Sequence, residues 1–286
     1  MRAINPPNIS LNDVLNTCIG SISSDELSTK LNAIIPSLMF AERDYIIKVA
    51  TSDLFQIPAF TRGDHAIVTG NVTKKELKDL YSSHMVPASK PARVYYDQIK
   101  MLAPLSICPF CGFGHVTTLD HYLPKAKYPL LSVLPNNLVA SCTDCNKGKN
   151  DETASTKQQQ CLHPYYDQGH YILEQWLYAE VEESSPASLK FNVNPPAHWS
   201  HDDKVRIQTH FTSFKLANRF RVQAATELPV LKGELEYDFT SAHTNGVRQA
   251  LQRKFFAASS QHVNWWKSAM YQALANSDWY CSGGFR

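Results

Sequence analysis

Two pairs of cysteines constrain the fold of this chain more than any other feature of its sequence. Each pair has two residues between its thiols, in Cys108-Pro-Phe-Cys111 and in Cys142-Thr-Asp-Cys145. This spacing lets both sulfurs of a pair approach one ion, and four thiolates complete a tetrahedral zinc shell. A thioredoxin-like redox site is the competing interpretation of one pair. It requires a βαβ context that the sequence lacks, and it leaves the other pair unexplained, so we expect structural Zn²⁺.

The composition describes a globular chain. Its 286 residues suffice for one large domain or two ordinary ones, and 43% are hydrophobic against 19% charged. No apolar run approaches the roughly 20 residues of a membrane helix. The first residues lack the apolar core of a signal peptide, so a cytoplasmic location is expected. We therefore interpret the remaining cysteines as ordinary buried thiols rather than parts of a disulfide framework; they are Cys18, Cys161 and Cys281.

The order of patterns along the chain predicts three regions. Residues 1–104 are helical, and Ser23 with Glu26 and Thr73 with Glu76 have the spacing of capping boxes. Residues 105–165 are rich in Cys, Pro, Gly and Asn and form an irregular module. Residues 166–286 begin with two strand-like segments, 171–182 and 188–194, and continue with helical patterns over 201–228 and 246–277. The fold class is therefore mainly α, with a small embedded zinc-stabilised module and a short β-hairpin after it.

The zinc site itself is expected to be structural. Four sulfurs leave no open coordination position for chemistry, and metal binding can contribute on the order of 10–16 kcal/mol to the folding of such a module. Thirty residues separate the two cysteine pairs. The function is therefore expected in this insert and in the residues directly after it.

Polar residues occur in the insert where the zinc would bring them together. The segment "VTTLDH" predicts a strand that ends in Asp120 and His121, and Asn146 directly follows Cys145 at the start of a helix. A carboxylate from Asp120 and a neutral oxygen from Asn146 suit Mg²⁺ or Mn²⁺. His121 is then a general base within reach of a water molecule.

The run "CPFCG…TLDHYLP…NNLVASCTDCNKGK" resembles the HNH endonucleases, which are ββα-metal nucleases with four zinc-binding cysteines. The resemblance covers residues 105–151. His121 matches the first position of the motif, Asn137 the central asparagine, and Asn146 the last position, where members carry His or Asn. The resemblance implies a ββα-metal module that hydrolyses phosphodiester bonds in nucleic acid. We expect DNA rather than RNA, but both carry the same phosphates, so the sequence leaves the target open. The resemblance also implies that Asn137 orients the imidazole of His121 through a hydrogen bond.

Segments on either side of the module extend the resemblance. The stretches "VYYDQIKMLAP" and "LHPYYD" are similar to HNH subunits of Septu-type and retron-borne anti-phage systems. Those subunits act with an ATPase partner, so the resemblance implies a nuclease effector of antiviral defence. A non-catalytic zinc-stabilised adaptor that binds nucleic acid or a protein stays open as the alternative, and metal-dependent nicking of a plasmid separates the two.

The net charge of +2 provides no global attraction to nucleic acid, so any binding must come from a local patch. Lys125, Lys147 and Lys149 are candidates for contacts with backbone phosphates, although a solvated surface role is equally open for each. His163 in "LHPYYD" is a further candidate for lining the cleft, and a turn residue is its alternative.

Overall fold

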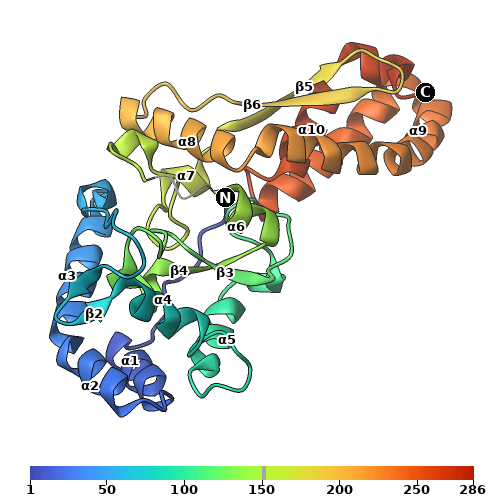
Figure 1. Ribbon diagram of the computed structural model, residues 1–286. Helices are drawn as coiled ribbons and strands as arrows, with labels where there is room; N and C mark the ends of the chain where they lie inside the picture. Colours follow the sequence, from blue (N-terminus) through green and yellow to red (C-terminus); the bar gives the residue numbers. More distant parts are fainter. Residues whose placement is uncertain (150–152) are drawn as a thin grey trace. The chain divides into compact units, whose positions relative to one another are not determined.

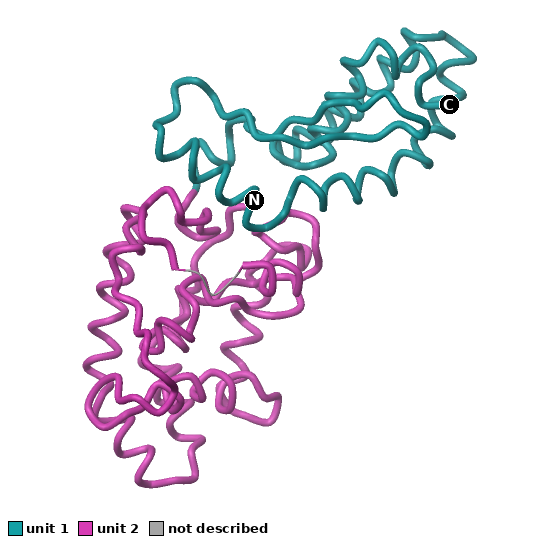
Figure 2. The backbone as a smooth tube through the Cα atoms, turned by 45° about the horizontal axis from the view of Figure 1, so that its top comes forward, with its two compact units in different colours: residues 1, 168–286 teal, residues 2–167 magenta. Residues whose placement is uncertain are grey.

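The computed structural model describes residues 1–149 and 153–286, and the chain divides into two compact units. One unit is Arg2–Asp167, and the other is Gln168–Arg286 together with Met1 (Figure 2). The boundary expected between residues 104 and 105 does not separate two units, because the N-terminal helices and the cysteine-rich module belong to the same one. The expected mainly helical fold is confirmed, and the described residues contain three two-stranded sheets.

The N-terminal part of the first unit consists of short helices and one small sheet (Figure 1). Thr73 caps its helix through a capping box with Glu76, as predicted, whereas the earlier cap is Ser24 rather than Ser23. The elements are α1 (Leu11–Gly20), α2 (Asp25–Ala33), α3 (Ile35–Ala50), β1 (Ile67–Thr69), β2 (Val72–Thr73), α4 (Lys74–Ser82) and α5 (Arg93–Met101).

A strand–strand–helix unit follows these helices. Strand β3 (Thr118–His121) pairs antiparallel with β4 (Leu138–Ser141), and α6 (Thr143–Gly148) begins two residues after β4 (Figure 1). The register places Thr118 opposite Ser141 and His121 opposite Leu138. Every residue of β4 is buried, because α5 packs against both strands and α6 packs against β3. The strand expected over 116–121 is thus present over Thr118–His121, two residues shorter at its start.

The second unit contains a β-hairpin that packs against helices. Its elements are α7 (His170–Leu173), β5 (Leu177–Glu182), β6 (Ser188–Val193), α8 (His201–Ser213), α9 (Leu216–Gln261) and α10 (Trp266–Asn276). Helix α10 packs against β5, and α9 packs against β6 and α10 (Figure 1). Leu189 and Phe191 alternate with exposed or half-buried residues along β6, and the Phe191 ring lies 5.5 Å from that of Phe220. The predicted hairpin is present, but its first strand starts at Leu177 because residues 170–173 form a helical turn.

Among the residues that the structure describes, no helix combines the length and the apolar character that a membrane crossing requires.

Candidate metal centre and adjoining polar site

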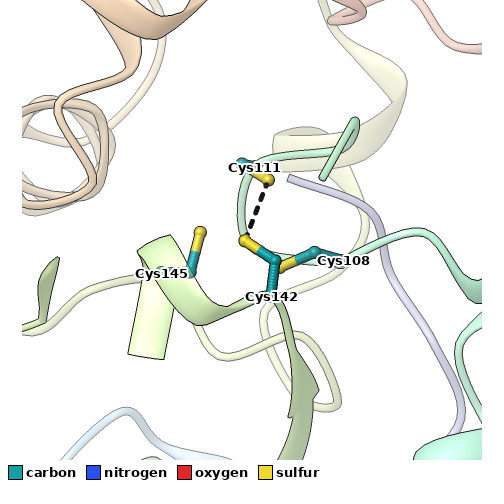
Figure 3. Close-up of side chains that lie close together, drawn as sticks. All are labelled: Cys108, Cys111, Cys142 and Cys145. Atoms are coloured by element: carbon teal, nitrogen blue, oxygen red, sulfur yellow. Dashed lines mark hydrogen bonds between the residues drawn. The ribbon is translucent and has the colours of Figure 1, made fainter. Parts of the chain in front are cut away.

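Four cysteines converge next to the β3–β4 sheet. Cys108 and Cys111 lie in the loop before β3, Cys142 follows β4, and Cys145 lies in α6 (Figure 3). All four are buried, and their sulfur atoms lie within 4.8 Å of one another. The Sγ atoms of Cys111 and Cys142 are 3.9 Å apart; four sulfurs bound tetrahedrally at about 2.3 Å would be about 3.8 Å apart. The four cysteines can hold a metal ion, as the sequence predicts.

Two glycines allow the chain to approach these sulfurs closely. Gly112 has a positive φ of 75°, a conformation that side chains disfavour. The amide of Gly114 donates a hydrogen bond to Cys111 Sγ at 3.3 Å. A Cβ atom on Gly114 would lie 2.9 Å from Cys142 Sγ, which is closer than real contacts allow. The sequence "CGFG" therefore suits a loop folded tightly around the thiols.

The thiols influence one another's protonation. Hydrogen bonds from Cys108 lower the pKa of Cys142 and lower the pKa of Cys111 to about 7. Hydrogen bonds with other thiols of the cluster raise the pKa of Cys108 and of Cys145. Four thiolates so close together repel each other, and a bound dication removes that penalty while releasing the remaining protons.

His121 is buried at the end of β3 with a defined tautomer. Its Nε2 lies 2.8 Å from the carbonyl oxygen of Ser132. A carbonyl only accepts, so Nε2 carries the proton and Nδ1 carries the lone pair. The ring also packs edge-on against Tyr81 of α4, with 4.4 Å between ring centres. Among the described residues, none forms a hydrogen bond with Nδ1, which leaves this nitrogen able to accept a proton.

The surroundings keep the imidazole neutral. Burial lowers the pKa of His121 to about 3, and the charge of Lys125 acts in the same direction. The hydrogen bond to Ser132 opposes both effects. At neutral pH the ring is therefore an uncharged acceptor.

Asn137 is fully buried and bonds the main chain. Its Oδ1 accepts a hydrogen bond from the amide of Leu123 at 2.7 Å. Its Nδ2 donates to the carbonyls of Leu123 at 3.0 Å and of Leu131 at 3.2 Å. The expected hydrogen bond from Asn137 to the imidazole is thus wrong, because these backbone groups occupy the amide. Since Leu131 precedes Ser132, Asn137 instead fixes the loop whose carbonyl holds His121.

Asp120 has different neighbours from His121. Its buried carboxylate faces Lys149, whose Nζ lies 3.3 Å from Oδ2. The same ammonium donates to the carbonyl of His121 at 3.2 Å and to that of Tyr122. Lys149 was predicted to contact a substrate phosphate. In the structure its ammonium is instead surrounded by protein oxygens.

One comparison with known proteins identifies a full-length relative. Protein ea31 of Escherichia phage lambda is 32% identical over 296 residues, which cover 99% of this chain and 100% of the phage protein. The chain belongs to the ea31 family. No family model and no solved structure matches it.

In this member of the ea31 family, Asn146 lies on α6, the helix that packs against β3. Its side chain is half-buried and forms no hydrogen bond with any residue that the structure describes. No described residue therefore occupies the amide oxygen. The packing of α6 against β3 agrees with the prediction that the cysteine cluster brings this helix close to the strand.

Two other lysines of the ea31-family chain have contrasting surroundings. Lys147 is exposed on α6. Lys125 is half-buried, donates a hydrogen bond to Ser82 Oγ at 2.9 Å and lies 4.5 Å from the centre of the Tyr81 ring. Burial lowers the pKa of Lys125. Lys147 can therefore reach a ligand freely, whereas Lys125 contributes its charge from a fixed position beside the ring that packs on His121.

His163 does not line a surface. It is 1% exposed, and its ring packs 4.2 Å from that of Tyr122. Its Nε2 lies 3.0 Å from the Tyr45 hydroxyl, and its Nδ1 accepts from the amide of Tyr165 at 3.2 Å. The predicted substrate-binding role is therefore wrong for this ea31-family chain, in which His163 joins buried tyrosines.

Sequence reasoning missed Tyr81 and Ser132, which contact the two sides of His121. The local sequence marks neither residue as part of a site. Tyr81 is an ordinary residue of a helix, and Ser132 contributes only its backbone carbonyl.

Proposed function

We propose that this protein is a metal-dependent HNH endonuclease that hydrolyses phosphodiester bonds in nucleic acid, DNA in preference to RNA. The supporting observation is His121. A neutral imidazole with its proton on Nε2 and its lone pair on Nδ1 lies at the end of the first strand of a strand–strand–helix unit. The cysteine cluster joins the loop before that strand to the helix after the second strand. This arrangement agrees with what the HNH resemblance implies.

We assign the four-cysteine site to structural Zn²⁺. Thiolates are soft ligands that favour zinc over oxygen-preferring cations, and a complete set of four leaves no position for substrate. The ion would hold the loop Cys108–Cys111 against the junction of β4 and α6. Its role is to maintain the position of α6 beside the end of β3.

In the proposed mechanism, His121 Nδ1 accepts a proton from the attacking water. The Ser132 carbonyl holds the opposite edge of the ring, and it stabilises the imidazolium because the hydrogen bond strengthens when the donor is charged. A substrate phosphate brings negative charge close to the ring and thereby raises the pKa of His121 from its low value. Asn137 maintains the loop that carries Ser132. A Mg²⁺ or Mn²⁺ ion held by Asp120 and Asn146 would supply electrostatic stabilisation of the phosphate and of the departing oxygen.

The biological setting in this proposal comes from the finer resemblance. HNH subunits of Septu-type and retron-borne systems act with an ATPase, so we propose a cytoplasmic nuclease effector with an ATPase partner. The relative in phage lambda shows that the ea31 family occurs in phages, which fits a role in conflict between phages and their hosts.

The test uses the purified full chain with supercoiled plasmid, single-stranded DNA and tRNA. Strand breaks that require added Mg²⁺ or Mn²⁺ and cease with EDTA support the nuclease. Binding to these substrates without strand breaks under every ion, with and without the ATPase partner, supports the adaptor instead.

A further inference from the structure

Lys149 lies in a cage of oxygen atoms and aromatic rings. Its Nζ donates hydrogen bonds to Asp120 Oδ2 at 3.3 Å, to the His121 carbonyl at 3.2 Å and to the Tyr122 carbonyl. The Tyr122 ring centre is 4.4 Å from Nζ, and that of Phe110 is 5.9 Å away. The side chain is only 14% exposed. These contacts use all three ammonium protons and place the cation over two π faces.

The same oxygen atoms are suitable ligands for a divalent cation. A carboxylate and two backbone carbonyls are hard donors of the kind that Mg²⁺ and Mn²⁺ prefer. Two cations that close to one carboxylate repel each other strongly at low solvent exposure. An ion that binds Asp120 through Oδ2 must therefore displace the ammonium.

The position of Lys149 in the chain allows this displacement. It follows the last residue of α6 and has non-helical backbone angles, with φ −79° and ψ 93°. A flexible four-carbon stem carries its charge. The ammonium can thus leave the cage without unwinding α6 or moving the cysteine cluster.

We propose that Lys149 is an internal cation that competes with the divalent metal for Asp120, so that metal binding requires Lys149 to leave the cage. This inference rests on the proposed nuclease function and deepens it. A released Lys149 is attracted to the phosphates of a bound nucleic acid, so substrate and metal favour each other's binding. The site therefore binds metal weakly until nucleic acid arrives.

The test compares the Mn²⁺ affinity of the full zinc-loaded chain with that of Lys149→Gln and Lys147→Gln. Mn²⁺ is used alone, and its unbound fraction is measured by electron paramagnetic resonance. We expect Lys149→Gln to bind Mn²⁺ roughly tenfold more tightly or better, since a competing unit charge is removed. The control Lys147→Gln removes an exposed charge from α6, two residues before Lys149, and should stay within about twofold of the parent.

A second measurement needs no substitution. Acetic anhydride labels accessible lysine amines, and mass spectrometry measures the label at each position. Mn²⁺ should increase the labelling of Lys149 several-fold and leave Lys147 unchanged. Equal Mn²⁺ affinity in Lys149→Gln and the parent, or labelling of Lys149 that Mn²⁺ does not increase, overturns the proposal.

Failure of this inference differs from failure of the proposed function. If the parent nicks plasmid with Mn²⁺ but Lys149→Gln binds the ion no more tightly, only the competition is wrong. If none of the three proteins binds Mn²⁺, both the competition and the proposed catalytic metal site are wrong.

Discussion

At the scale of single residues, burial determines the charge of His121. The imidazole is enclosed by Tyr81 and the loop that carries Ser132, and its Nε2–H is used by a carbonyl. A protonated ring would be poorly solvated there, which is why its pKa falls to about 3. This property affects the stability of the folded chain, and in the proposed mechanism it keeps the imidazole able to accept a proton.

The stability of the protein should therefore depend on pH through His121. The pKa is about 3 in the folded chain, against 6.5 as its ordinary value. As pH falls below 6.5 the unfolded chain binds the proton first, so stability is lost between pH 6.5 and pH 3, by up to about 1.4 kcal/mol per pH unit. Urea unfolding of the parent and of His121→Ala at several pH values from 7 to 5 measures this. The parent should lose stability more steeply than the variant, and parallel slopes would contradict the buried neutral state.

Asn146 provides a second prediction. Asn146→His should retain substantial activity, because it also offers a neutral ligand from the same turn, and imidazole should shift the preference toward Mn²⁺ or Ni²⁺. Asn146→Ala offers no ligand and should lose most activity. Initial cleavage rates in limiting Mg²⁺, Mn²⁺ and Ni²⁺ measure both effects. An Asn146→Ala variant as fast as the parent in limiting Mg²⁺ would show that Asn146 is not a ligand.

The residue identities of the candidate site were accessible from the sequence, and their partners were not. The order of Asp120, His121 and Asn146 relative to the cysteines is a property of the chain itself. The partner of Asn137 is a backbone turn, and the cage around Lys149 includes two backbone carbonyls. Backbone acceptors carry no residue signature, so sequence reasoning assigned both side chains to other roles.

At the scale of elements, the cysteine cluster joins the loop before β3 to the start of α6. The close approach at Gly114 provides a test that leaves every thiol in place. In Gly114→Ala the new methyl group would lie 2.9 Å from Cys142 Sγ. We expect less bound zinc per chain, a lower melting temperature and, as a consequence, less cleavage.

Gly148→Ala is the matched control, since among the described residues no atom beyond the chain neighbours and the backbone of α6 lies within 4 Å of the added Cβ. It should keep the zinc content and melting temperature of the parent. Zinc is measured by plasma mass spectrometry after gel filtration. If Gly114→Ala and Gly148→Ala have equal zinc content and equal stability, the loop at Gly114 does not pack tightly against a metal-binding cysteine cluster, and this account of the loop is wrong.

Elements with a strong local pattern were predictable, and those that depend on distant contacts were not. The Thr73–Glu76 capping box and the hairpin are examples of the first kind. Helix α7 has four residues, too few to show helical periodicity, and it was included in a strand. The helical pattern over 201–228 is divided at Lys215, which has a positive φ of 52°. A lysine carries no sequence signal for that conformation, since it is uncommon outside glycine and asparagine.

At the scale of the whole molecule, the near-neutral charge limits how strongly the chain attracts nucleic acid, which is the substrate in the proposed function. With a net charge of +2 and the Lys149 ammonium occupied by protein oxygens, the electrostatic contribution to binding is small. We expect the isolated chain to bind duplex DNA weakly, in the micromolar range or above, as is typical of non-specific contacts. Fluorescence anisotropy at several salt concentrations measures this, and addition of the proposed ATPase partner should tighten binding. Tight, salt-insensitive binding by the chain alone would contradict this expectation.

The measurement that tests the central claim most directly is plasmid nicking by the parent and by His121→Ala at equal zinc content. Both proteins receive Mg²⁺ or Mn²⁺, and the loss of supercoiled plasmid is followed with time. The account predicts metal-dependent nicking by the parent and a rate lower by roughly a hundredfold or more in His121→Ala, the contribution expected of a general base. A His121→Ala rate within about tenfold of the parent, below the range of general-base catalysis, would contradict it.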